Sequence, residues 1–317
     1  MIRLPQAAGF LLAACALLGG CVTRGPLLES RTQAVELDDT PFFAQDAHQC
    51  GPAALATVLA ASAVSVTPED LESRVYLPGR RGSLQVEMQA APRAFGRLAY
   101  RIEPELSAIA AELDAHRPVL VLHNYGLPFW PRWHYAVVVG YDGTKDVITL
   151  RSGRKRRQQL SAANFMRAWD NGNRWALVVL RPGELPAHPD RQRYLDAAAA
   201  FEGVAQPQDA WSTFDAAVKQ WPEEPVAWIG RGTASYRLAD KPAAAADYRA
   251  ALHLDGTQAA AHNNLAMTLL EMGCAAQARE QIEQIDAARL DARLRSEVMD
   301  TRQQIEAARH TNRCTAP

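Results

Sequence analysis

The fold is decided by the stretch from Trp133 to Gly143, which reads WHYAVVVGYDG. Its β-branched and aromatic residues predict a strand over His134–Tyr141, and Asp142-Gly143 ahead of the apolar run Val147–Arg151 predicts a β-hairpin. Two further strand-like runs are Pro118–His123 and Arg174–Leu180. Helical patterns come earlier in the chain, at about Gly51–Ala61, Pro68–Val75, Leu84–Phe95 and Glu105–His116. Helices followed by an antiparallel sheet predict an α+β domain over residues 41–183.

The composition is that of a globular protein of about two domains. Of the 317 residues, 48% are hydrophobic and 22% are charged, which excludes a disordered chain. The net charge of −1 provides no global field for nucleic acid, so we expect no nucleic-acid partner. The sequence has no Walker motif, no Cys-x-x-Cys pair and no His/Cys cluster, so we expect no metal and no cofactor.

The N-terminus has the pattern of an exported lipoprotein. After Arg3, an apolar run from Ala7 to Leu18 ends in Gly19-Gly20-Cys21, which describes a secretory signal peptide over residues 1–20. The ending resembles a bacterial lipobox, which implies cleavage before Cys21 and acylation of its thiol and new amino group, and hence a stable lipid anchor. Val22 after the cysteine implies the outer membrane, facing the periplasm. An ordinary signal peptide with an incidental cysteine is the alternative.

Residues 21–40 carry Gly, Pro and alternating charges without an apolar period, and they predict a tether. In the exported protein Cys50, Cys274 and Cys314 remain as thiols, and an oxidising compartment favours pairing two of them. Cys274 and Cys314 both lie in the C-terminal helical region and form the candidate disulfide. Cys50 is then the unpaired thiol.

From about Asp190 the sequence becomes Ala-rich and repeats every 34 residues. The best copy has Trp228, Gly232, Tyr236, Ala244 and Tyr248; the copy after it has His262, Ala266, Leu270, Ala278 and Ile282, and the copy before it has Tyr194, Ala198, Glu202, Ala210 and Phe214. This pattern resembles the tetratricopeptide repeat. With a polar terminal helix at about Ala292–Arg309, it predicts an all-α repeat domain over residues 190–310 that binds a protein partner on its concave face. An unrelated helical bundle is the alternative.

Cys50 and His134 are the candidate catalytic residues. Cys50 stands just before Gly51-Pro52 and an apolar helix, at the positive end of the helix macrodipole, so we expect a lowered thiol pKa. A buried structural cysteine is the alternative. His134 opens a strand, where its imidazole can act as a base. A cysteine on an early helix and a histidine on a later strand have the order of papain-like cysteine peptidases.

The segments from Gln45 to Ala54 and from Trp133 to Tyr141 together resemble the bacteriocin-processing, double-glycine-leader branch of the papain-like peptidases. The resemblance covers about residues 41–182 and implies a papain-like fold that hydrolyses a peptide or protein substrate. It implies Cys50 as the nucleophile, His134 as the general base and acid, and an upstream glutamine as a side-chain donor to the oxyanion. Gln45 is the candidate for that donor, and Gln49 is its rival.

The third catalytic residue departs from the family pattern. Family members usually carry Asp at the end of the strand that follows the histidine strand, and this chain has Ser152 there. The hairpin places Asp142 and Asp146 at its far end, roughly 25 Å from His134 at about 3.3 Å per residue, so neither can orient the ring. Ser152 is the positional match. Asn124 or Asn164 reaching in from outside the hairpin are the alternatives.

Two features beside the candidate site have open interpretations. The segment Arg151–Arg157 holds five basic residues in seven, which is either a solvated strand end or a contact for an acidic substrate or lipid headgroups. Phe129, Trp130 and Trp133 precede His134 and either line a substrate groove or pack in the core.

Together these features predict an outer-membrane-anchored, periplasmic cysteine peptidase with a helical repeat domain for protein binding. A catalytically degenerate, peptide-binding scaffold is the rival, favoured by Ser152 in place of Asp; the retained Gln45, Cys50 and His134 argue against it. A transglutaminase or amidase with the same residues is a third possibility.

Overall fold

The structure is a computed structural model that describes residues 28, 31–44, 49–80, 82–127, 129–308 and 314. Within these residues one antiparallel sheet of seven strands forms the N-terminal domain, in the order β2-β7-β3-β4-β5-β6, with β1 paired to the far part of β4. The strands are β1 (Ala34–Glu36), β2 (Leu98–Arg101), β3 (Val119–Asn124), β4 (Trp133–Asp142), β5 (Val147–Ser152), β6 (Lys155–Ser161) and β7 (Ala176–Leu180).

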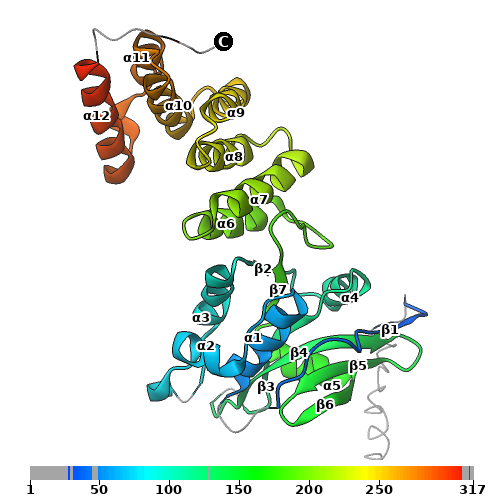
Figure 1. Cartoon of the computed structure of the whole chain (residues 1–317). Helices are drawn as coiled ribbons and strands as arrows, with labels where there is room; N and C mark the ends of the chain where they lie inside the picture. The colour runs from blue at the N-terminus through cyan, green and yellow to red at the C-terminus, as the bar shows by residue number, and fades with distance from the viewer. Residues whose placement is uncertain are drawn as a thin grey trace, which may run out of the picture.

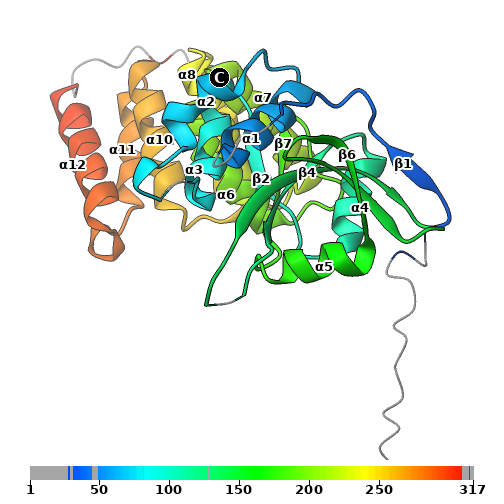
Figure 2. The ribbon, with the colours of Figure 1, turned by 90° about the horizontal axis from the view of Figure 1, so that it is seen from below.

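Helices cover both faces of this sheet (Figure 2). One face packs against α1 (Cys50–Ala61), α2 (Pro68–Val75) and α3 (Gln85–Ala90), with the 3₁₀ turns η1 (Pro78–Arg80) and η2 (Ala91–Phe95); the other packs against α4 (Leu106–Asp114) and α5 (Ala162–Asp170). The alternation of β4 explains the two layers, because Val137 and Val139 enter the core on the α1 face while Ala136 and Val138 enter the core on the α5 face.

The α+β architecture is confirmed, and the predicted helices and strands of this domain lie within a few residues of their observed bounds. The tether prediction is wrong for residues 34–36, which form β1 on β4, and Leu28 is buried in the core. Sequence patterns also missed β2, β6 and α5. Strand β6 reads KRRQQLS and lacks an apolar face, because it is the exposed edge of the sheet.

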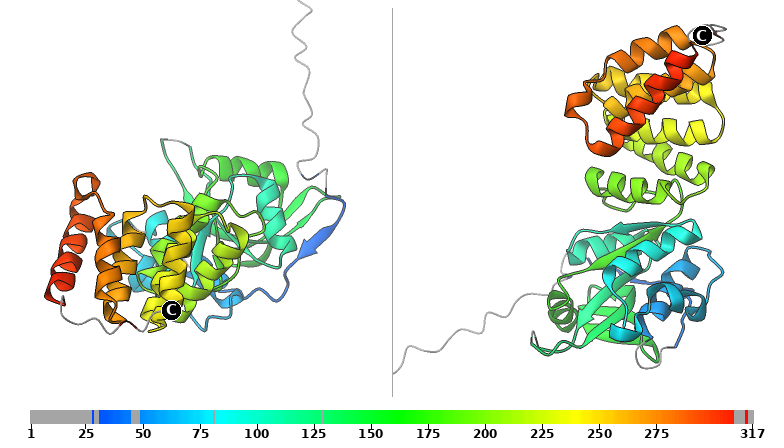
Figure 3. Two further views of the ribbon diagram at one scale, coloured as in Figure 1. Left: turned by 90° about the horizontal axis from the view of Figure 1, so that it is seen from above. Right: turned by 90° about the vertical axis from the view of Figure 1, so that its left-hand side faces the viewer.

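The C-terminal domain is a stack of helix pairs (Figures 1 and 3). The first helices of the pairs are α6 (Arg191–Glu202), α8 (Pro225–Arg237) and α10 (Ala259–Glu271), and the second are α7 (Pro207–Gln220), α9 (Lys241–Leu254) and α11 (Ala275–Glu283). Both sets begin at intervals of 34 residues, and a 3₁₀ turn η3 (Ala287–Arg289) leads to the terminal helix α12 (Ala292–Ala307). Gly232 is a signature position because a Cβ there would lie 2.8 Å from the Tyr248 ring. The repeat prediction is confirmed in its period and helix order.

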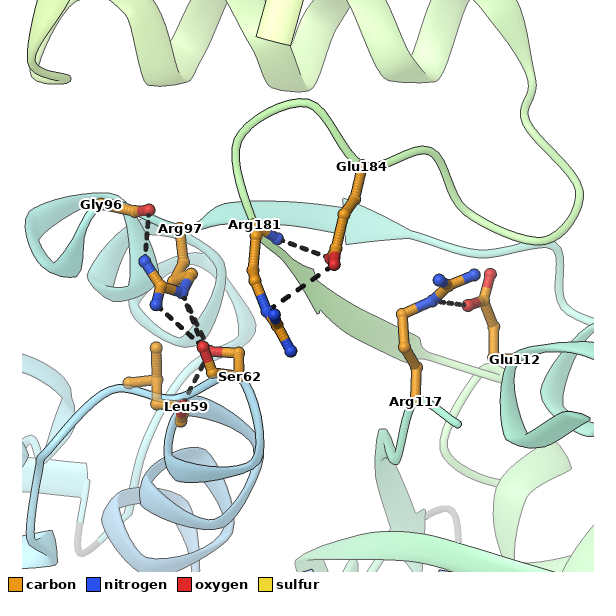
Figure 4. Close-up of polar contacts among 8 residues, drawn as sticks. All are labelled: Leu59, Ser62, Gly96, Arg97, Glu112, Arg117, Arg181 and Glu184. Carbon is orange, nitrogen blue, oxygen red and sulfur yellow. Dashed lines mark hydrogen bonds and ion pairs between the residues drawn. The ribbon is translucent and has the colours of Figure 1, made fainter. Parts of the chain in front are cut away.

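Specific polar contacts fix the connection between the domains, and Figure 4 shows two of the pairs beside it, Glu112 with Arg117 and Arg181 with Glu184. The buried Glu112 of α4 accepts hydrogen bonds from Arg117 and from the Ala187 backbone N–H, at 2.6 and 2.7 Å. Arg181, at the end of β7, pairs with Glu184. The Tyr100 hydroxyl of β2 accepts from the Asp190 backbone N–H, at the start of α6. The first repeat therefore packs directly on the sheet edge at β2.

In the part of the chain that the structure describes, no helix combines the length and apolar character needed to span a bilayer.

Candidate active site

Cys50 is the first residue of α1 and is half-buried. The helix start has no side-chain cap from Gln49, so backbone N–H groups remain available for the thiol. The backbone N–H groups of Tyr135, Gly51 and Cys50 itself are close enough to the sulfur to favour its thiolate form. Tyr135 follows His134 directly on β4, so these contacts bring the thiol to the strand that carries the histidine.

The expectation of a lowered thiol pKa is wrong. Burial raises the pKa of the Cys50 thiol, and the three N–H donors offset only part of that effect. The sequence pattern locates the helix end but not the depth of the sulfur below the surface. The site therefore holds a neutral thiol at rest.

His134 lies at the start of β4 and is half-buried. Its Nε2 lies 2.9 Å from the Ser152 Oγ, at the end of β5. Burial lowers the pKa of the His134 imidazole, so the neutral base is favoured near neutral pH. Among the described residues, Nδ1 of this ring has no hydrogen-bond partner, and it is the nitrogen left to exchange a proton.

The alternatives to Ser152 as the partner of His134 lie elsewhere. The Asn124 side chain accepts hydrogen bonds from the backbone N–H groups of Gly126 and Arg132 and so holds the loop between β3 and β4. Asn164 is exposed in the first turn of α5. Asp142 pairs with Lys145 at the far turn of the hairpin, as the predicted geometry requires. Of the three candidates, Ser152, Asn124 and Asn164, only Ser152 is hydrogen-bonded to the His134 ring.

Gln45, the predicted oxyanion donor, lies outside the described residues, as do His48 and the acylation candidate Cys21. Gln49 is exposed at the N-cap of α1. Cys274 and Cys314 form a disulfide, and Cys50 is the free cysteine of the described chain. No group of three or more His, Cys, Asp or Glu side chains in the described ranges is arranged to hold a metal.

Sequence reasoning missed a second histidine beside the site. His123 of β3 lies opposite His134 in the sheet register and is fully buried. Its Nδ1 lies 2.8 Å from the Tyr125 hydroxyl, and burial, together with His134, lowers the pKa of His123 to about 3. Tyr125 in turn stands with its ring centroid 6.0 Å from that of His134. His123 and His134 lie opposite each other because β3 and β4 are neighbouring strands of the sheet, and no local pattern in the sequence indicates this pairing.

An open groove of about 390 Å³ adjoins His134 and Ser152. Its walls are the start of β4, the loop before it, and the turn between β5 and β6, with the lining residues Tyr125, Arg132, Trp133, His134, Ser152, Gly153, Arg154, Lys155 and Gln158. Trp133 thus lines the groove, which is one of the two interpretations that the sequence left open. Phe129 and Trp130 are 82% and 75% exposed, so the core-packing interpretation is wrong for both.

Residues 37–176 match the model of the Peptidase_C39 like family. The match covers the N-terminal domain and less than half of the chain. The match spans β2 to β6, helices α1 to α5, and both Cys50 and His134, and the resemblance inferred from the sequence is confirmed for this domain.

Solved structures resemble each domain separately. A putative C39-like peptidase from Bacillus anthracis is 14% identical, with 47% of this chain and 98% of that chain covered and a TM-score of 0.40. A double glycine motif protease from an AMS/PCAT transporter, solved with its leader peptide, is 22% identical over 47% of this chain and 92% of that chain, with a TM-score of 0.34. The TPR2B domain of yeast Sti1, in a complex with pHsp70, is 18% identical over 38% of this chain and 95% of that chain, with a TM-score of 0.34. No curated protein matches the chain.

Proposed function

We propose that this protein is a cysteine peptidase that hydrolyses peptide bonds with Cys50 and His134. The observation that supports the proposal is the shared strand: Cys50 packs against the cluster that contains Tyr135 of β4, and the adjacent His134 is hydrogen-bonded to Ser152. In this proposal the nucleophile, the base and the group that orients the base act together at the start of β4, as acyl transfer requires.

The reaction begins from a neutral thiol and a neutral imidazole. His134 Nδ1 takes the thiol proton as the sulfur attacks the carbonyl carbon, and the carbonyl oxygen becomes an oxyanion. Backbone N–H groups at the start of α1 and the Gln45 amide stabilise that charge. The C–N bond then breaks, His134 gives its proton to the leaving amine, and water hydrolyses the thioester with His134 again as the base. The carboxylic acid leaves and the thiol is restored.

The test is hydrolysis of a peptide library by the full chain, with products identified by mass. We expect cleavage that is lost in Cys50→Ala and in His134→Ala, while circular dichroism shows that both variants remain folded. Products in which an amine replaces water would indicate transglutaminase chemistry, and release of ammonia without chain cleavage would indicate an amidase. Either result would contradict peptide hydrolysis.

A peptide-binding scaffold without catalysis is the second candidate. Two observations favour it: a serine hydroxyl rather than a carboxylate holds His134, and burial raises the thiol pKa. This function predicts that the unaltered chain binds library peptides and releases no product, with the same affinity in the Cys50→Ala variant.

We further propose that acylated Cys21 anchors the protein to the outer membrane, facing the periplasm, and that the helical repeats bind a protein partner. The lipobox-like ending before Cys21 supports the anchor. The stacked helix pairs support the partner, because repeat folds of this kind bind proteins on a concave surface. Growth with a labelled palmitate precursor should label the natural chain and not Cys21→Ser, and the label should fractionate with outer membranes.

A further inference from the structure

The groove beside His134 has a one-sided charge. Three of its lining residues, Arg132, Arg154 and Lys155, are basic, and none of the described residues that line it is Asp or Glu. It is also in contact with the proposed machinery, because both His134 and Ser152 form part of its wall. A peptide that reaches the histidine through this groove must therefore pass these cations.

The basic residues near the groove fall into two groups: those that are bonded to other parts of the protein, and those whose charge is free to contact a ligand. Arg151 is buried and donates to the backbone carbonyl groups of Leu37, Asp38 and Thr40, so it fixes the N-terminal segment on the sheet. Arg157 makes two hydrogen bonds to the Glu36 carboxylate, at 2.7 and 2.8 Å.

Arg132 and Lys155 differ from these structural cations. Both are exposed at the groove, and within the described residues neither side chain has a carboxylate partner. Their positive charge is therefore available to a ligand.

The chemistry of the proposed reaction tells which part of a substrate occupies the groove. Cys50 attacks the carbonyl carbon and keeps the acyl segment, whereas His134 protonates the leaving amine. The groove includes His134 and Ser152 but no residue of α1. The groove therefore lies on the histidine side of the site, where the leaving-amine segment of the substrate must be.

We propose that this groove binds an acidic side chain on the leaving segment, so that the protein prefers substrates with Asp or Glu within the first few residues after the cleaved bond. This inference rests on the proposed peptidase function. Arg132 and Lys155 supply the charge, and the rings of Tyr125 and Trp133 supply flat apolar walls for the peptide beside it.

The experiment compares matched peptides that differ after the cleaved bond by Glu against Gln or Asp against Asn. For the unaltered chain we expect kcat/KM to be about fivefold or more higher for the acidic peptide, as for a charge-assisted contact in a partly exposed site. The double variant Arg132→Gln/Lys155→Gln should lose this preference. Arg156→Gln is the matched control, since Arg156 lies next to Lys155 on β6, outside the groove lining, and it should keep the preference.

A binding measurement separates this inference from the peptidase proposal. With the full-length Cys50→Ala protein, fluorescence anisotropy should show that the acidic peptide binds more tightly than its amide counterpart. This difference in affinity should shrink with added salt. It should disappear in the triple variant Cys50→Ala/Arg132→Gln/Lys155→Gln. If no peptide is cleaved but this pattern holds, the peptidase proposal fails, whereas the proposal that the groove binds acidic side chains stands.

Three results would overturn the proposal that this groove binds acidic side chains. One is equal binding and turnover of acidic and amide peptides, and another is a preference that survives loss of both cations. The third is that Arg132→Gln/Lys155→Gln weakens binding to vesicles containing phosphatidylglycerol and leaves acidic-peptide binding unchanged, which would assign the groove to lipid headgroups.

Discussion

The Nε2 of His134 and the Oγ of Ser152 lie 2.9 Å apart, across the hairpin of β4 and β5. A hydroxyl in this position can accept the ring N–H and fix the orientation of the imidazole, but it carries no charge with which to stabilise an imidazolium. Ser152 can therefore orient the ring as the third member of a triad does, but without the charge of a carboxylate.

Two substitutions of Ser152 should change the rate of peptide hydrolysis in opposite directions. Ser152→Ala removes one neutral hydrogen bond and should lower kcat/KM by about 3- to 10-fold. Ser152→Asp places a carboxylate on Nε2, which should raise the pKa of His134 and increase kcat/KM. Steady-state kinetics on one peptide measures both changes, and an unchanged rate in Ser152→Ala would show that this contact does not orient the catalytic ring.

The reactivity of Cys50 should depend on pH as a buried thiol does. Burial raises the thiol pKa and lowers the pKa of His134, so the uncharged pair dominates near neutral pH. Since only the thiolate reacts with iodoacetamide, the alkylation rate should be slow at pH 6 and still rising above about pH 8.5, the ordinary thiol value. A rate that reaches its plateau below pH 7 would instead reveal a preformed thiolate–imidazolium pair.

Gly51 should tolerate no side chain. A Cβ at this position would lie 2.1 Å from the Ser83 Oγ, beside the nucleophile at the start of α1. Gly51→Ala should therefore lower the free energy of unfolding by about 1–3 kcal/mol and displace Cys50, with a large loss of activity. Gly79→Ala is the control, because nothing lies within 4 Å of its Cβ position. Urea denaturation and peptide turnover of both variants measure the difference.

The Cys274–Cys314 disulfide should stabilise the repeat domain selectively. It closes a segment with a sequence separation of 40, for which a cross-link contributes about 2–4 kcal/mol. Cys314→Ser should lower the denaturation midpoint of the C-terminal helices and leave turnover at Cys50 unchanged. Loss of peptide turnover in this variant at low denaturant would show that the two domains unfold together.

The sequence predicted the elements whose side-chain pattern is local. Helix α2 begins and ends at the predicted Pro68 and Val75, because Thr67 caps it and its apolar residues recur at helical spacing. The 34-residue period located the three repeats, since both helices of each pair begin 34 residues after those of the pair before it. Cys50, His134 and Ser152 were likewise found from a helix start, a strand start and a hairpin register.

Only the tertiary structure decided what depends on neighbours distant in the chain. It placed β1 on β4, opposed His123 to His134, and brought Arg132 from the loop before β4 and Lys155 from the start of β6 into one groove. It also reversed the expected direction of the thiol pKa of Cys50. A helix end is visible in the sequence, whereas the desolvation of an atom depends on every segment packed around it, and for Cys50 that desolvation outweighs the nearby N–H donors.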